Sequence, residues 1–142
     1  MEGYGYPPDV EPGADRNGWS PTEDIGAVDD AGDLTLFGRA DQCFKASSGH
    51  LVSPDHVADV LETHPAVSGA VVVPLSSPRG LLIGALVESA GALDSDEIRR
   101  YASRALPAWM QPQVVGVTRE LPRLPGGKPD RQRLIRQLEA LL

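Results

Sequence analysis

The sequence predicts a small α+β domain, in which a three-stranded sheet packs with about three helices after a short hairpin and hinge region. Segments with helical spacing of apolar residues alternate with short β-branched runs, in the order helix–strand–strand–helix–strand–helix. The chain has 142 residues, which is enough for one compact domain. Because only 5% of the residues are aromatic, Val, Leu, Ile and Ala must supply most of the core.

The first helix is predicted to begin after Ser53, whose hydroxyl can cap free backbone N–H groups, with Pro54 at its first position. His64 and Pro65 end it. Its apolar face consists of Val57, Val60 and Leu61.

Two apolar, β-branched runs follow, at 67–75 and 81–89, and the short loop 76–80 between them predicts an antiparallel pair. A third strand is predicted at 114–118.

Asp94 and Glu97 form a start for the second helix that resembles a capping box. Its apolar positions have helical spacing. A Pro- and Gly-containing loop at 122–127 precedes the last helix, whose apolar residues are Leu134, Ile135, Leu138, Leu141 and Leu142.

The part before these elements is less regular. Residues 1–18 contain many Gly, Pro and acidic residues and are predicted to be irregular, and residues 34–37 suit a short strand. Residues 38–52 are interpreted as a loop with a strand at each end. We therefore divide the chain into a leader with a short strand, 1–37, and a C-terminal domain, 38–142.

The charge of the chain is −7 and is unevenly distributed. Nine acidic residues and one basic residue precede residue 34, whereas six basic and three acidic residues follow residue 118. The overall charge argues against an unaided nucleic-acid binder. The basic end is suited to a small anion such as a nucleotide phosphate, and solvated helix charge is the alternative.

Membrane spans and metal sites are not predicted. No apolar run approaches the roughly 20 residues that cross a bilayer, and no secretory signal is visible, so we expect a cytoplasmic protein. The single cysteine, Cys43, excludes an internal disulfide, and the three histidines are too scattered to indicate a metal site.

Six segments together resemble the adenylate-forming enzymes, which include acyl- and aryl-CoA synthetases, luciferase and the adenylation domains of non-ribosomal peptide synthetases. They occur in the order of that family, within residues 18–134, the region that resembles its small C-terminal domain and hinge. The segments are GWSPTED (18–24), GRAD (38–41), KASSGHLVSP (45–54), HPAV with AVVV (64–67 and 70–73), LPAWMQP (106–112), and LP with GGKPDR (121–122 and 126–131).

The resemblance implies that Lys128 is the catalytic lysine of carboxylate adenylation. This step brings a carboxylate to the α-phosphate of ATP, so its transition state needs fixed positive charge. A lysine on a Gly-Gly loop offers a compact cation on a long stem. The alternative for a lone GGK is an ordinary exposed loop lysine.

Four further residues take roles from the same resemblance. Asp24 corresponds to the aspartate that binds ribose, with one more acid of an acidic leader as the alternative. Arg39 corresponds to the arginine near the nucleotide, with a structural salt bridge as the alternative. Asp41 corresponds to the hinge about which the small domain turns. Gly49 resembles the glycine beside the pantetheine tunnel.

The chain departs from the family pattern in three places. Glu23 replaces the glycine of TGD, one extra residue stands between Lys45 and Pro54, and His56 stands where glutamate is usual. These departures affect the thiol-transfer role more than the fold. The large N-terminal part of the family's enzymes, with its phosphate loop and acyl pocket, has no counterpart here.

Two classes of function follow. In the first, the chain is a lid that is inactive alone and supplies Lys128 to an N-terminal adenylation core domain, in cis or in trans. ATP/AMP with Mg2+ would then be shared with the core, and CoA or the phosphopantetheine of an acyl carrier protein would accept the acyl group. In the second, the chain is a non-catalytic interaction module that binds a core enzyme or carrier protein. Retention of Lys128, Asp24, Arg39 and Asp41 favours the first class, whereas Glu23 and the extra loop residue favour the second.

Overall fold

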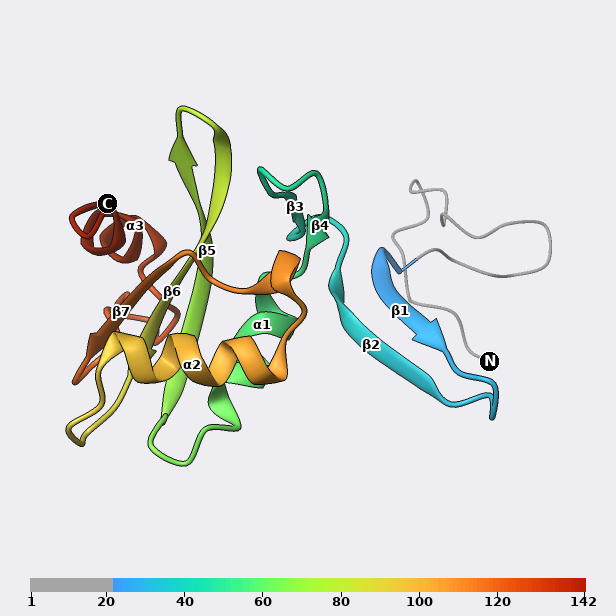
Figure 1. The fold of residues 1–142 in the computed structure, drawn as a ribbon, viewed down its shortest axis with the longest axis horizontal. Coiled ribbons are helices and arrows are strands. Elements are labelled where there is room, and N and C mark those ends of the chain that lie inside the picture. The colour runs from blue at the N-terminus through green and yellow to red at the C-terminus, as the bar shows by residue number, and fades with distance from the viewer. Residues whose placement is uncertain (1–21) are drawn as a thin grey trace, which may run out of the picture.

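The structure is a computed structural model that describes residues 22–142. Its central element is a three-stranded sheet with helices on both faces (Figure 1). The elements are β1 (Asp24–Val28), β2 (Leu34–Arg39), β3 (Phe44–Lys45), β4 (Leu51–Val52), α1 (Pro54–Glu62), β5 (Gly69–Ser77), β6 (Gly80–Glu88), α2 (Ser95–Ala105), the short 3-10 helix η1 (Ala108–Met110), β7 (Val114–Thr118) and α3 (Arg131–Glu139). The predicted α+β class, with a three-stranded sheet and about three helices, is confirmed.

The sheet has the strand order β5-β6-β7. As predicted, β5 and β6 are antiparallel, but they extend to Ser77 and Gly80 and leave a connection of only two residues. β7 pairs in parallel with β6, which the sequence analysis did not specify. Because parallel neighbours need a crossover, α2 lies between β6 and β7 in the chain and forms a β-α-β unit with them.

Side chains alternate between the two faces of the sheet and so form two cores. Ala70 and Val72 of β5 face α1 and α2, whereas Val73 and Leu75 face α3. In Figure 1, α1 and α3 accordingly lie on opposite sides of the sheet. The first core also includes Val57, Leu61, Ile83, Ala85, Val87, Ile98, Ala102 and Val115, and the second also includes Leu86, Val114, Leu121, Leu134 and Leu138.

The predicted helix starts are confirmed in detail. The Ser53 hydroxyl accepts a hydrogen bond from the His56 N–H, and the Asp94 carboxylate accepts one from the Glu97 N–H at 2.7 Å. α3 begins in the same way, with Asp130 accepting from the Arg133 N–H at 3.1 Å.

Two glycines bring α3 close to the sheet. A Cβ on Gly84 would lie 2.6 Å from Leu75 Cδ1 and 3.2 Å from Leu138 Cδ1. A Cβ on Gly116 would lie 2.8 Å from Leu86 Cδ1 and 3.2 Å from Leu141 Cδ1. Leucines of the sheet and of the α3 end therefore occupy the space that larger residues at these two positions would need.

The β1–β2 hairpin projects from the domain beside α1 (Figure 1). The sequence pattern predicted a strand at 34–37, within β2, but no strand at 24–28. Gly26, Ala27 and Asp24 have low strand propensity, and the antiparallel pairing with β2 is what extends this segment. At the base of the hairpin, Gly38 has a φ of +136° and lies so close to the Ser53 hydroxyl that no Cβ would fit.

Candidate functional site

Lys128 follows a tight turn between β7 and α3. The Gly127 N–H donates to the Leu124 carbonyl at 2.8 Å, and the Leu124 N–H donates to the Lys128 carbonyl at 2.7 Å. This pattern is a β-turn with Pro125 at its second position, followed by a left-handed residue, Gly127, with a φ of +86°. The glycine before the lysine therefore has a backbone role, because it closes the turn.

The Lys128 side chain is exposed, and within residues 22–142 it makes no hydrogen bond or ion pair. The loop around it is nevertheless fixed. The Arg123 guanidinium donates to the Gly127 carbonyl at 3.3 Å, and the Asp130 N–H donates to the Pro122 carbonyl at 2.9 Å. The fold thus presents an ammonium group to solvent on an ordered support.

Glu88, at the end of β6, holds the start of this loop and was not singled out from the sequence. Its carboxylate accepts hydrogen bonds from the Leu121 N–H at 2.8 Å and from the Ser68 hydroxyl at 3.0 Å. The bond from Leu121 is the main cause that lowers the pKa of the Glu88 carboxyl, followed by the bond from Ser68. A lone acid ending an apolar strand was the only sequence signal for this role.

Further cations surround the Lys128 loop. Arg123 and Arg133 line a shallow hollow of about 240 Å³ together with Glu120 and Gln137. Arg131 and Arg133 lie in the first turn of α3, which carries no acidic side chain. Positive groups at a helix N-terminus add to the positive end of its dipole, and the Asp130 carboxylate at the N-cap offsets part of this charge.

A second group of charged residues lies at the base of the β1–β2 hairpin. Asp24 and Arg39 are partners in the strand register. The Arg39 guanidinium donates to the Asp41 carboxylate at 3.0 Å and lies 3.6 Å from that of Glu23. The hydrogen bond that Arg39 donates to Asp41, followed by the negative charge of Asp41, raises the pKa of the Arg39 guanidinium.

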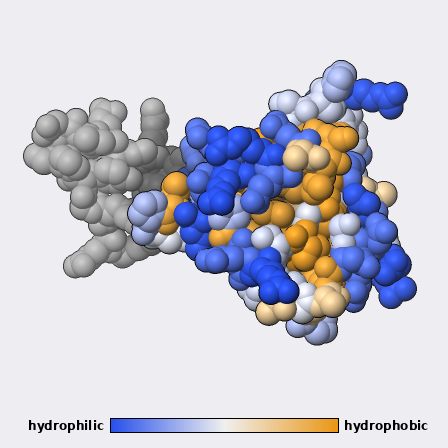
Figure 2. Space-filling view, turned by 90° about the vertical axis from the view of Figure 1, so that its left-hand side faces the viewer, coloured by the Kyte–Doolittle hydropathy of each residue, from blue (hydrophilic) through white to orange (hydrophobic). Residues whose placement is uncertain are grey.

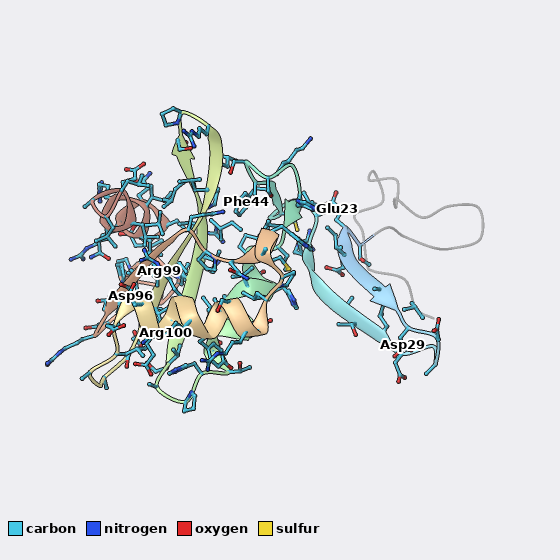
Figure 3. All side chains as sticks on the ribbon, in the orientation of Figure 1. Glu23, Asp29, Phe44, Asp96, Arg99 and Arg100 are labelled. Atoms are coloured by element: carbon cyan, nitrogen blue, oxygen red, sulfur yellow. The ribbon has the colours of Figure 1, made fainter. Side chains whose placement is uncertain are left out.

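These ion pairs give Arg39 the contacts of a structural salt bridge, the alternative considered for it above. All four side chains are exposed, so the pairs add little stability in water. Figure 3 marks Glu23 at this base and Asp29 at the far tip of the hairpin.

Glu23 has a left-handed backbone with a φ of +61°, the sole positive φ of a non-glycine residue among residues 22–142. This conformation costs a non-glycine residue about 1–2 kcal/mol. The glycine that Glu23 replaces in the TGD pattern would adopt it freely. The departure at this position therefore adds backbone strain as well as a negative charge.

Gly49 lies at the tip of the β3–β4 hairpin, in a turn of the same kind as the one before Lys128. The Gly49 N–H donates to the Ala46 carbonyl, and the Ala46 N–H donates to the His50 carbonyl. The φ of Gly49 is +85°, and a Cβ there would meet no atom within 4 Å. The backbone alone thus accounts for a glycine at this position.

An aromatic contact beside Gly49 was also not predicted. The ring of His50 stacks on that of Trp109, with centroids 4.9 Å apart. This stack links the β3–β4 hairpin to η1.

The structure brings Asp24, Arg39 and Asp41 together but does not bring Lys128 to them. The hairpin contacts α1 through β2, whereas α3, which follows the Lys128 loop, packs on the opposite face of the sheet (Figure 1). Within the described part of the chain, no three His, Cys, Asp or Glu side chains gather closely enough to hold a metal ion. None of its helices is long and apolar enough to cross a membrane. The GWSP portion of the first motif, with Trp19, lies outside the described residues.

Comparison with known proteins identifies relatives over nearly the whole chain. A probable 2-succinylbenzoate–CoA ligase of Mycobacterium tuberculosis is 34% identical over 142 residues, covering 96% of this chain and 37% of the relative. A 4-coumarate–CoA ligase of Vanilla planifolia is 31% identical over 99% of this chain and 26% of its own length. The chain therefore spans about a quarter to a little over a third of these relatives.

Solved structures show the same fold. The O-succinylbenzoate coenzyme A synthetase of Bacillus subtilis, in complex with AMP, matches 89% of this chain and 25% of its own with a TM-score of 0.69 and 27% identity. An amide bond synthetase of Marinactinospora thermotolerans matches 84% of this chain and 25% of its own with a TM-score of 0.67 and 30% identity. Residues 56–128 match the family described as AMP-binding enzyme C-terminal domain. With half of its length matched by this family, the chain belongs to the AMP-binding enzyme C-terminal domains of the adenylate-forming superfamily.

Proposed function

We propose that this chain acts as the lid of an acyl-CoA-ligase-type enzyme and supplies the Lys128 ammonium for ATP-dependent adenylation of a carboxylic acid. The observation that supports this proposal most strongly is the exposed, unpaired Lys128 side chain on a turn fixed by Arg123 and Asp130. A cation that has no internal partner and stands on an ordered support is available to a charge outside the domain.

The chemistry requires positive charge because two anions react. The carboxylate oxygen attacks the α-phosphorus of ATP, the new C–O–P linkage forms, and the bond to the pyrophosphate leaving group breaks. An ammonium beside the reacting oxygens offsets the charge that builds there. The positive potential around the Lys128 loop is increased by three nearby arginines, Arg123, Arg131 and Arg133.

A separate core domain would hold the substrates, and we propose that this chain is inactive without it. The hollow beside the Lys128 loop is shallow, and the nucleotide-binding candidates Asp24 and Arg39 lie on another part of the molecule. We propose that ATP and its Mg2+ bind to the core, that the Asp24 carboxylate contacts the ribose, and that Arg39 exchanges an internal carboxylate partner for the nucleotide.

The β1–β2 hairpin offers the contact surface for that core. Val28 pairs with Leu34 and Gly26 with Leu36, so three apolar side chains gather on one face of the hairpin. Their residues are 66%, 63% and 62% exposed. An isolated hairpin with an uncovered apolar face needs a partner, and the relatives carry more than half of their length outside the matched part.

We propose Asp41 as the hinge, and Gly49 as a neighbour of the thiol of CoA or phosphopantetheine in the second half-reaction. Asp41 directly follows the hairpin and is held by Arg39 alone among the described side chains. Rotation about this position would exchange this ion pair and the hydrogen bonds that the Gln42 and Cys43 N–H groups donate to the Arg39 carbonyl. A non-catalytic module that binds a core enzyme or carrier protein remains the second candidate, and strained Glu23 favours it.

A chimera tests the proposal. The core of the Bacillus subtilis relative, without its own C-terminal part, is fused to residues 41–142 of this chain and assayed by ATP–pyrophosphate exchange with the acid of that core. We expect the fusion to exceed the core alone, Lys128→Ala to remove the gain, and Arg79→Ala, an exposed cation on the β5–β6 turn, to keep it.

A fusion that matches the lid-less core, or a gain that survives Lys128→Ala, would contradict the catalytic proposal. The interaction module is then tested directly, by measuring whether the separate chain binds the core and whether Leu36→Lys abolishes binding. The catalytic lid thus predicts a gain in ATP–pyrophosphate exchange that depends on Lys128, whereas the interaction module predicts binding to the core without that gain.

A further inference from the structure

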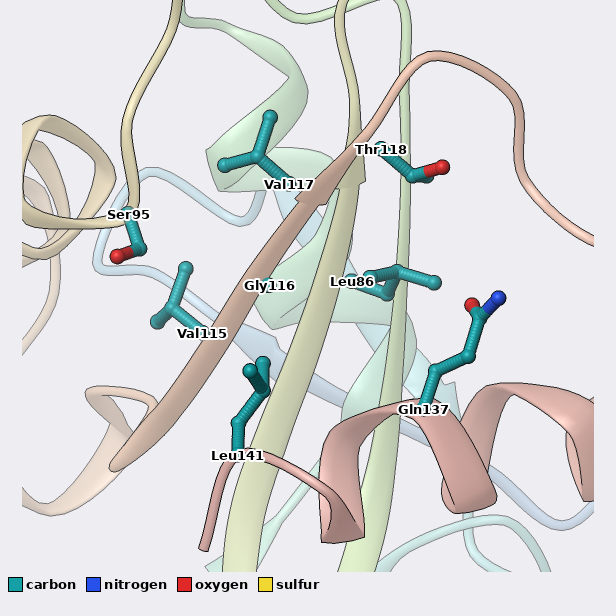
Figure 4. Close-up of a pocket in the computed structure, with 8 residues that line it drawn as sticks. All are labelled: Leu86, Ser95, Val115, Gly116, Val117, Thr118, Gln137 and Leu141. Carbon is teal, nitrogen blue, oxygen red and sulfur yellow. The ribbon is translucent and has the colours of Figure 1, made fainter.

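The hollow beside β7 offers no group for proton transfer. It has a volume of about 400 Å³, and its lining includes Leu86, Val117, Gln137 and Leu141 (Figure 4). None of the eight described residues that line it is titratable. Figure 2, which shows the molecule from this side, has an apolar strip between two hydrophilic areas. A side chain that exchanges a proton in the proposed acyl transfer must therefore lie elsewhere.

The histidines His50 and His64 differ in what their ring nitrogens contact. Nδ1 of His64 accepts a hydrogen bond from the Ala66 N–H at 3.1 Å, and its Nε2 lies 3.6 Å from the Glu97 carboxylate. Both nitrogens of His64 are thus engaged inside the domain. His50 is exposed, and its Nδ1 contacts the Ser48 hydroxyl at 3.3 Å. Within the described part of the chain, Nε2 of His50 has no hydrogen-bond partner.

The β3–β4 turn that carries His50 is held on two sides. The Ser47 N–H donates to the Leu81 carbonyl at 2.7 Å, which ties the turn to β6. On the other side, the His50 ring stacks on Trp109 with an interplanar angle of 17°. Trp109 packs in turn against the first core. The imidazole therefore has a fixed orientation although it is exposed to solvent.

The contacts of the His50 ring suit a proton acceptor. When its Nδ1–H donates to the Ser48 hydroxyl, the lone pair of Nε2 is free. After Nε2 takes up a proton, the stacked indole of Trp109 attracts the positive charge. The preceding residue, Gly49, leaves open space beside the ring, since a Cβ there would meet no atom within 4 Å. An acceptor molecule can therefore approach this turn.

We propose that His50 is the general base of the second half-reaction and takes the proton from the thiol of a pantetheine arm. Its Nε2 accepts the S–H proton, the sulfur forms a bond to the acyl carbon, and the bond from that carbon to the AMP oxygen breaks. AMP leaves with the electron pair, and the imidazolium releases its proton to water. This inference rests on the proposed function, in which Gly49 neighbours the thiol.

A base accelerates this step because a thiol is mostly protonated at neutral pH. A thiol with the pKa of a cysteine side chain, about 8.5, is ionised to only a few per cent at pH 7. The thiolate is the form that attacks. Loss of the base should therefore slow the thiol step at pH 7, and the deficit should shrink toward pH 9, where the thiol ionises without help. The ring contacts Trp109 and Ser48, and neither ionises between these pH values.

The chimera described above tests the inference, with the first half-reaction as its internal control. The acyl-adenylate is formed in advance, CoA is added, and thioester formation is followed in a single turnover. We expect His50→Gln and His50→Phe to slow this step by about tenfold or more at pH 7 while ATP–pyrophosphate exchange persists. Phe keeps a flat ring against Trp109, so a role of His50 in packing alone predicts that His50→Phe retains thioester formation.

Chemical rescue adds a second measurement. Added imidazole should restore thioester formation in His50→Ala, which opens a space beside Trp109, and rescue also shows that this variant is folded. A deficit that is equal at pH 7 and pH 9 and that imidazole does not reduce would mean a packing role and would overturn the inference.

The remaining outcomes separate this inference from the lid function. Thioester formation at the unchanged rate in His50→Gln and His50→Phe, with normal exchange, would overturn the role of His50 and leave the lid function standing. A fusion without Lys128-dependent exchange would contradict the lid function itself, and this inference with it.

Discussion

Removing the Glu88 carboxylate should destabilise the segment that leads into the Lys128 loop. The expected loss in the free energy of unfolding follows from the contacts of this carboxylate. Glu88→Ala deletes the acceptor for the Leu121 N–H and for the Ser68 hydroxyl. Leu121 is only 3% exposed, so its N–H would lose a charged partner with little water to replace it. Hydrogen bonds to charged groups contribute about 1.5–3 kcal/mol each, less where solvent competes, which gives a loss of about 2 kcal/mol.

Urea denaturation measures this loss. With a slope of about 2 kcal/mol per molar urea for a domain of this size, the midpoint should fall by about 1 M. Hydrogen exchange at the Leu121 amide should accelerate in the same variant. Glu88→Gln isolates the charge, because the amide keeps one acceptor oxygen, and should cost about 1 kcal/mol at neutral pH.

The contribution of Glu88 to the free energy of unfolding should depend on pH in a defined direction. The folded protein holds the pKa of Glu88 below its ordinary value of 4.5. The carboxylate therefore contributes its full stabilisation above that value and loses it as the pH falls through the lower folded pKa. The difference between the unchanged chain and Glu88→Gln should accordingly shrink from pH 7 to pH 3. Equal stability at pH 7, or a difference that is the same at both pH values, would refute this reasoning.

Three further predictions concern the frame of the candidate site, and each is measured as a change in the free energy of unfolding in urea. Glu23→Gly should stabilise the protein by about 0.5–1 kcal/mol, because glycine adopts the positive φ without strain. A decrease in stability would mean that the ion pair of Glu23 with Arg39 contributes more than the backbone strain costs. Gly84→Ala should lower the free energy of unfolding by about 2 kcal/mol, because the added Cβ would clash with Leu75 and Leu138. Gly91→Ala is the control and should change it little, because no atom lies nearer than 4.0 Å to the added Cβ. Similar effects of both substitutions would argue against close packing of α3 on the sheet. Asp130→Ala should cost about 1 kcal/mol by removing the cap of α3, and an unchanged midpoint would show that water replaces the cap.

Local signals predicted most of the domain. Ser53 and Asp94 lie at the caps where hydroxyl and carboxylate chemistry places them, and β7 spans the predicted residues. The parallel pairing of β7 was not predicted, because strand direction follows from the α2 crossover rather than from any local pattern. β1 was missed for a similar reason: pairing with β2, and not its own residues, extends it.

The candidate site was less accessible to sequence reasoning. Resemblance indicated Asp24, Arg39 and Asp41, and the hairpin register explains why residues fifteen or more positions apart meet. The functional roles of these residues, of Lys128 and of Gly49 remain predictions. The positive φ of Glu23 and the anchoring role of Glu88 depend on contacts with distant segments, which no local pattern reveals.

The turn before Lys128 is closed by its own backbone bonds and tied to Arg123 and Asp130, so the peptide that carries the lysine cannot travel far by itself. A displacement of the Lys128 ammonium that exceeds the length of its own side chain therefore requires a rotation of the whole domain. On our proposal that Asp41 is the hinge, the sheet and α3 would act as a lever arm, and a modest torsion near Asp41 would become a large displacement of Lys128. Stiffening that pivot should consequently restrict the lysine as effectively as altering the turn itself.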